Sequence, residues 1–223
     1  MTLTTFHPMA TRGPRKKTAE KPRYHHGDLR QALLEASLAL ISEEGFGALS
    51  LREVARRAGV THAAPYRHFA DKEALLAAVA EQGFRTMTAR MKERMARQTT
   101  PEGRLGACGV AYVLFAMEHA SHFRVMFGPH FTQPLHLGAS DGDADAFGLL
   151  VASITECQRA GVVSEGDSRM LALTCWSLVH GLASLLVDGK LAGSGISTVD
   201  QAESLAEAQT RLLVRGLGHA SRD

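Results

Sequence analysis

The sequence has few of the features that mark an exported, metal-binding or membrane protein. Its 223 residues include three cysteines, Cys108, Cys157 and Cys175, which share no metal-ligand spacing and lie in apolar helical stretches. We therefore expect small core residues in a reducing cytoplasm. No apolar run approaches the roughly 18–20 residues that a membrane span needs, and the basic N-terminus has no signal-peptide core. These absences predict a cytoplasmic protein without a membrane partner.

Motifs of the common enzyme classes are also missing. The sequence contains no Ser/His/Asp nucleophile elbow, no phosphate-cradling glycine loop and no HExxH zinc motif. The Gly193-Ser194-Gly195 piece is typical of a short linker between helices. We expect no catalytic residues and no cofactor. Because no alternating strand pattern and no internal repeat is present, the fold class is predicted to be all-α.

Charge is divided unevenly along the chain, although the net charge is only +2. Residues 1–98 carry 17 Lys and Arg against 10 Asp and Glu, whereas residues 99–223 carry 8 against 13. A positive front half is typical of a protein with a polyanionic partner, and an acidic rear half indicates a different task. The alternative is that the basic residues form only a solvated face.

The stretch 50–72, SLREVARRAGVTHAAPYRHFADK, has the pattern of a helix-turn-helix. Ser50 and Glu53 predict a capping box at the start of the first helix, and Gly59 supplies the left-handed residue that ends it. Thr61 is placed to cap the second helix, which would lie in the DNA major groove. Pro65 lacks an amide, so we expect a tight or slightly shifted first turn and an unbroken helix.

Helical periodicity continues through most of the remaining chain. The candidate helices are one from an Asp28 cap to about Gly45, one from an Asp71 cap to about Gln98, and then 103–119, 121–127, 144–160, 167–188 and 198–217. Three units are predicted: a basic tail (1–26), a helix-turn-helix DNA-binding domain (27–73) and a helical effector-binding and dimerisation domain (74–223). Whether the tail contacts DNA or only aids solubility stays open.

Two parts of the chain resemble one family of regulators. LSLREVARRAGV at 49–60 and APYRHFADKEALL at 64–76 are similar to the DNA-binding domain of TetR (tetracycline-repressor-like) transcriptional regulators. Trp176, His180 and Gly181 resemble the C-terminal domain of a TetR subgroup named for Trp-His-Gly. The resemblance implies a homodimeric repressor that binds a double-stranded, pseudo-palindromic operator and is released by a small-molecule effector.

The resemblance implies DNA-binding roles for residues of the helix-turn-helix and its flanks: Ser50, Thr61, His62, Ala63, Ala64, Tyr66, Arg67, His68 and Lys72. Arg67 is the best candidate to read a base, because its fork can pair with guanine O6 and N7. Ser50, Tyr66, His68 and Lys72 are expected to hold phosphates and so set the register. The alternative for Tyr66 and His68 is simple packing inside the head.

The rear half contains two further candidate sites. Apolar residues at helical spacing predict a dimer interface of two helices per chain: Leu171, Cys175, Leu178, Leu182, Leu205 and Leu212. The resemblance also implies an effector pocket, for which we expect Tyr112, Phe115, His119, Phe123, Phe147, Trp176 and His180. The alternative function is a metal-responsive regulator that uses histidines such as His119, His122, His130 and His136.

Overall fold

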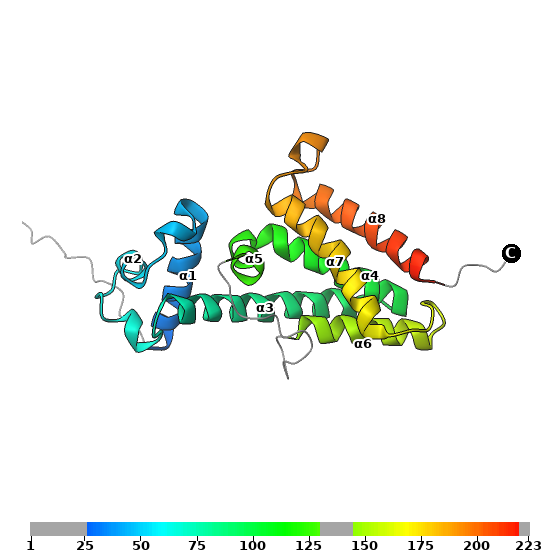
Figure 1. Ribbon diagram of the computed structural model, residues 1–223, viewed down its shortest axis with the longest axis horizontal. Coiled ribbons are helices and arrows are strands. Elements are labelled where there is room, and N and C mark those ends of the chain that lie inside the picture. Colours follow the sequence, from blue (N-terminus) through cyan, green and yellow to red (C-terminus); the bar gives the residue numbers. More distant parts are fainter. Residues whose placement is uncertain (1–25, 130–144, 219–223) are drawn as a thin grey trace, which may run out of the picture.

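The computed structural model describes residues 26–129 and 145–218, in which helices are joined by turns and short loops (Figure 1). The α-helices are α1 (His26–Glu44), α2 (Leu51–Arg57), α3 (Lys72–Ala96), α4 (Pro101–Glu118), α5 (Ala120–Phe127), α6 (Ala146–Arg159), α7 (Ser168–Val187) and α8 (Val199–Leu217). Three short 3-10 helices are η1 (Phe46–Ala48), η2 (Pro65–Arg67) and η3 (Ala192–Ser194). No strand occurs in the described ranges, which confirms the predicted all-α class. The predicted tail lies almost wholly outside them.

Helix α2 begins and ends much as its sequence predicts. The Ser50 hydroxyl oxygen accepts the Glu53 amide at 3.2 Å, but the Glu53 carboxylate bonds to Arg56 instead of returning to Ser50. The capping box is therefore only half formed. At the other end Gly59 has φ +70°, and the Val60 amide donates to the Ala55 carbonyl at 3.0 Å. This is the hydrogen-bond pattern of a glycine-ended Schellman motif.

The second helix of the predicted helix-turn-helix is shorter than expected. The Ala64 amide donates to the Thr61 carbonyl, and the next regular element is η2, a single 3-10 turn from Pro65 to Arg67. The prediction of a helix that starts at Thr61 is therefore wrong. The physical reason is Pro65, because it has no amide to donate to the Thr61 carbonyl and the chain closes tight turns instead.

Helix α3 connects the two ends of the molecule (Figure 1). The carboxylate of Asp71 caps it by accepting the Ala74 amide at 2.8 Å, as the sequence predicts. Its 25 residues begin in the head, beside α1, and end at Ala96 among the helices of the rear half, between α4 and α6 in the view of Figure 1. Buried residues along its length, from Leu75 to Met95, join the core of the head to the core of the body.

Helix α4 lies at the centre of the body and contacts α3, α6, α7 and α8. It begins at Pro101, two residues before the predicted start, because the Thr100 hydroxyl caps the Gly103 amide at 3.1 Å. Proline is well tolerated at this first helical position, where its missing amide would have no partner. Gly161 and Gly189 have positive φ values just after α6 and α7, which confirms their predicted role as helix ends.

Helix α7 corrects the expectation that no segment could cross a membrane. By length and composition alone this 20-residue helix is apolar enough to do so, with a mean hydropathy of 1.8. It packs instead on α4 and α6, with Ala172 and Ala183 fully buried. The apolar residues on one side of α7 therefore pack in the core of the body. Its other side carries exposed Met170, Leu178 and Leu185.

Candidate DNA-binding surface and ligand cavity

The residues predicted to read DNA form the outer surface of the head around η2. Six of them are exposed: Thr61, His62, Ala63, Tyr66, Arg67 and His68. Ala64 is half-buried, while Pro65 and Phe69 turn inward and are buried. The Tyr66 ring is 60% exposed, so it does not pack inside the head.

Arg67 differs from the other arginines near it. The guanidinium of Arg56 bonds to Glu53, and that of Arg57 bonds to Glu43, so that α2 is tied to α1. Among the residues that the structure describes, none forms a hydrogen bond or ion pair with the Arg67 side chain. Its planar set of donors is thus free to pair with a base edge or a phosphate.

Ser50 and Lys72 lie at the starts of α2 and α3 and are exposed. The Ser50 oxygen accepts the Glu53 amide, which leaves the hydroxyl proton available to a phosphate. The Lys72 ammonium donates to the Phe46 carbonyl of η1 at 3.1 Å. An ammonium has three donors, so two remain for another acceptor. Each side chain is thus held in place by one hydrogen bond and still has a donor available for a phosphate.

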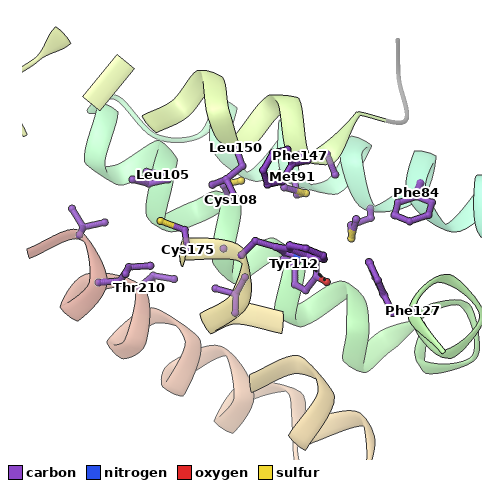
Figure 2. Close-up of a pocket in the computed structure, with 17 residues that line it drawn as sticks. Phe84, Met91, Leu105, Cys108, Tyr112, Phe127, Phe147, Leu150, Cys175 and Thr210 are labelled. Atoms are coloured by element: carbon purple, nitrogen blue, oxygen red, sulfur yellow. Dashed lines mark hydrogen bonds between the residues drawn. The ribbon is translucent and has the colours of Figure 1, made fainter. Parts of the chain in front are cut away.

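A cavity of about 70 Å³ lies in the body, lined by residues of α3, α4, α5, α6, α7 and α8 (Figure 2). Its walls are built mainly of aliphatic, aromatic and sulfur-containing side chains: Phe84, Met87, Met91, Leu105, Cys108, Gly109, Tyr112, Phe127, Ala146, Phe147, Leu150, Cys175, Trp176, Val179, Thr210, Leu213 and Val214. A single water needs only about 10–15 Å³ of such space. The cavity is therefore large enough for a small guest.

The predicted pocket residues divide into two groups. Tyr112, Phe147 and Trp176 line the cavity, whereas Phe115, His119, Phe123 and His180 do not. Phe115 is fully buried in the core and stacks on His119, with ring centroids 5.0 Å apart. Phe123 and His180 face a separate groove that α5 and α7 form with Phe46 of η1. Helical periodicity correctly predicted that α4, α6 and α7 border the cavity, but it did not predict which face of α4 and α7 lines it.

Three polar side chains meet at the edge of the cavity. The Trp176 indole N–H donates to the Tyr112 hydroxyl oxygen at 3.2 Å, and that hydroxyl lies 2.8 Å from Nδ1 of His180. Burial raises the pKa of the Tyr112 hydroxyl above its ordinary value and lowers that of His180. Both groups are consequently neutral near pH 7. Trp176 and His180, the first two residues of the Trp-His-Gly pattern, thus both contact the Tyr112 hydroxyl.

Two further histidines pack beside one another at the junction of α4 and α5. Burial lowers the pKa of His119, and burial together with nearby His119 lowers that of His122 to about 4. His119 Nε2 is buried without a hydrogen-bond partner in the described part of the chain. No group of three or more His, Cys, Asp or Glu within residues 26–129 and 145–218 could hold a metal ion. His130 and His136 lie outside these ranges.

The three cysteines are buried, as the sequence predicts, on α4, α6 and α7. Burial raises the pKa of Cys108 to about 12 and that of Cys157 and Cys175 to about 11. Thiols with such values stay protonated near neutral pH and react slowly. Cys175, which the sequence assigned to the dimer interface, lines the cavity instead.

The other residues predicted for the dimer interface lie at different depths. Leu178 is 37% and Leu212 68% exposed, Leu171 and Leu205 are partly buried, and Leu182 is buried within the chain itself. Exposed Met170, Leu185 and Val199 extend the apolar surface of α7 and α8. These two helices contact each other and lie at one side of the molecule (Figure 1). A surface of this kind is typical of an interface.

Sequence reasoning missed the walls of the cavity that come from α3 and α8. Phe84, Met87 and Met91 of α3 and Leu213 and Val214 of α8 all border it. One signal was available, because Met87, Met91 and Met95 recur every four residues along a single face of α3. Flexible thioethers are often found where a surface must adapt to a ligand. Periodicity alone does not separate such a stripe from ordinary core.

Two family descriptions match the chain, one at each end. Residues 33–79 match the model of "Bacterial regulatory proteins, tetR family", which covers the head and the start of α3. Residues 105–213 match "Tetracyclin repressor-like, C-terminal domain", which covers the cavity and most of α7 and α8. Together they span more than two thirds of the chain.

Individual relatives agree with these matches. The HTH-type transcriptional regulator AcrR of Shigella flexneri is 40% identical over 63 residues, which span 28% of this chain and 29% of AcrR. A protein of unknown function from Rhodococcus sp. RHA1 is 35% identical with a TM-score of 0.70, over 89% of this chain and 100% of its own. The TetR family regulator PfmR from Thermus thermophilus shares the fold, with a TM-score of 0.59 at 21% identity over 84% of this chain and 99% of PfmR.

Proposed function

Because this chain belongs to the TetR family of bacterial regulatory proteins, we propose that it is a cytoplasmic, homodimeric repressor released from its operator by a small molecule. In this proposal residues 27–73 form the DNA-binding domain, and residues 74–223 form the effector-binding and dimerisation domain. The chain is thus a binding protein and not an enzyme. The nine residues around α2, η2 and the start of α3 provide the contacts to double-stranded DNA.

The observation that carries the proposal is the course of α3. At its first residue the Lys72 ammonium bonds to the Phe46 carbonyl within the head. Further along the same helix, Phe84, Met87 and Met91 form one wall of the cavity. A molecule that enters the cavity presses on these side chains, and a rigid helix transmits the displacement to the head.

The size of the cavity supports this coupling. An engineered cavity of about 150 Å³ in another protein binds benzene. The cavity here measures about 70 Å³, so a guest with an aromatic ring must push its walls apart. Helices that pack at crystal-like density respond by moving as units. The occupied and empty states therefore differ in the position of α3, which the DNA contacts sense.

DNA binding is tested first with the purified full chain. Fluorescence anisotropy compares an intergenic fragment next to the coding region, a pool of randomised duplexes and one fixed unrelated duplex. We expect a selected sequence to bind about 10³-fold or more above the unrelated duplex at physiological salt. Equal affinity for every duplex at all salt concentrations would refute a sequence-specific regulator.

Release is tested with the selected operator in hand. An effector that prefers the non-DNA state must weaken operator binding, and the operator must weaken effector binding by the same factor. Both titrations are measured on one preparation, with a protein lacking the Arg67 guanidinium (Arg67→Ala) as the matched control for effector binding without DNA binding. An operator affinity that stays unchanged when the effector saturates the protein would refute release by that molecule.

A further inference from the structure

The cavity contains no charged side chain among the 17 that line it. Its Thr210 hydroxyl donates to the Glu207 carbonyl at 3.2 Å, and the Thr210 methyl is the group nearest to Gly109 of α4. The cysteine thiols are buried and protonated. Transfer of an unpaired charge into such surroundings is strongly unfavourable. The guest is therefore uncharged.

The polar group at the edge of the cavity has no proton to offer. Trp176 donates its N–H to the Tyr112 oxygen, which lies 2.8 Å from His180 Nδ1. When the proton of His180 is on Nε2, the Tyr112 hydroxyl donates to Nδ1. The other tautomer of His180 would donate to Tyr112 and leave the tyrosine proton without an acceptor among apolar side chains. Buried donors are almost always paired, so the first arrangement is the stable one. Towards a guest, the Tyr112 oxygen can therefore act only as an acceptor.

This oxygen lies towards the end of the cavity where Phe127 enters (Figure 2). The surrounding rings of Phe84, Phe127, Phe147 and Trp176 offer edges and faces to another ring, and Met87 and Met91 supply sulfur atoms that favour aromatic contacts. The recognition elements are thus an aromatic enclosure and a single hydrogen-bond acceptor.

We propose that the cavity binds a small, neutral aromatic molecule whose polar group is an O–H or N–H donor, such as a phenol, bonded to the Tyr112 oxygen. The proposal rests on the proposed function, because it names the chemical class of its effector. It excludes carboxylates, and it disfavours ethers and ketones of the same size, because the wall offers their acceptor only weak thiol donors and the Thr210 hydroxyl, which already donates to the Glu207 carbonyl.

Trp176 provides the readout, since it is the only tryptophan in the chain and lines the cavity. Its fluorescence is titrated with phenol, anisole, toluene and benzoate in the full-length wild-type protein. Phenol and toluene are expected to alter the emission saturably, and benzoate is expected to leave it unchanged. Saturable binding of benzoate, or the absence of binding by phenol, would overturn the proposal.

The donor rule is tested by removing the acceptor of the Tyr112 proton. In a His180→Leu variant the hydroxyl proton is released and can turn to the guest, so anisole gains a donor. We expect the preference for phenol over anisole, measured as the ratio of dissociation constants, to fall about three- to tenfold, the equivalent of one neutral hydrogen bond. Toluene affinity should stay within about twofold, which separates this effect from a general disturbance of the cavity.

His122→Leu is the matched control, because His122 is another half-buried histidine with a lowered pKa and does not line the cavity. It should keep the wild-type ratio. An unchanged ratio in His180→Leu would overturn the donor rule. The operator assay separates this result from the proposed function: a phenol that binds with the expected preference but leaves operator affinity unchanged supports the ligand class and refutes the effector role.

Discussion

At the scale of single residues, Arg67 has the clearest role to test. Its guanidinium extends from η2 without a partner among the described residues, next to arginines that are already paired. Arg67→Ala should cost about 1–3 kcal/mol on the operator and relax base preference at one position in each half-site. Competition titrations with operators altered one base pair at a time measure this. An equal loss on unrelated DNA would assign Arg67 to phosphate contact alone.

Lys72 is expected to act through charge instead of base recognition. It remains held against the Phe46 carbonyl while two of its donors are free. Lys72→Ala should weaken binding to all duplexes alike and reduce the slope of log affinity against log salt by about 1. Lys190→Ala, which removes a charge beyond the end of α7, is the control and should leave the slope unchanged. The same slope in both variants would contradict a phosphate contact at Lys72.

His122 should make stability depend on pH. Its pKa in the folded protein is about 4, below the ordinary value of 6.5, so the unfolded chain binds more protons between these values. The free energy of unfolding should therefore decline as the pH falls from 6.5 towards 4, by about 1–2 kcal/mol after allowance for partial exposure. Urea unfolding of wild type and His122→Leu across this range measures the difference. A parallel decline in both proteins would assign the effect to other groups.

At the scale of elements, Gly59 is the residue on which the turn after α2 depends. Its φ of +70° is left-handed, and an added Cβ would meet nothing within 4 Å, so strain is the only penalty for a side chain. Gly59→Ala should destabilise the protein by about 1–2 kcal/mol. Gly216→Ala, in α8 and equally open, should be neutral or stabilising by up to about 1 kcal/mol. Thermal unfolding compares the two, and equal effects would show that the turn tolerates a side chain.

The elements also show where sequence reasoning succeeds and where it stops. Caps at Ser50 and Asp71 and the left-handed Gly59 are local signals, and the structure confirms each of them. The reduction of the second helix to η2 follows from one missing amide at Pro65, whose effect depends on how the neighbouring turns close. The cavity could not be placed in this way, because its walls come from six helices whose separation only packing decides.

At the scale of the whole molecule, a chain of polar contacts fixes the head on the body. Gln31 of α1 accepts a hydrogen bond from the Gln82 side chain of α3 at 3.1 Å, and His122 of α5 lies 3.4 Å from the same amide group. Helix α5 comes close to α3 there because Gly83 has no side chain, and Met126 occupies the space that a Cβ would need. These contacts join α1 of the head to α3 and α5.

The proposed function needs a dimer, because two such heads must be held at a fixed spacing to read a two-fold symmetric operator. Leu178 of α7 and Leu212 of α8 are the residues to alter, since both are exposed in the single chain. Leu178→Glu and Leu212→Glu should each convert the dimer to a 24.0 kDa monomer, because a carboxylate in an apolar interface loses its hydration. Light scattering coupled to size-exclusion chromatography measures the mass.

The controls for this experiment follow from burial. Ala152→Glu places the same charge on an exposed position of α6 and should leave the dimer intact. Leu182 is unsuitable, since it is buried within the chain and a charge there would unfold the body before any interface is tested. Both monomeric variants should keep their helical circular dichroism and lose operator affinity by about 10²-fold or more, because each head then binds alone. A dimer that survives both substitutions would place the interface on a surface other than α7 and α8.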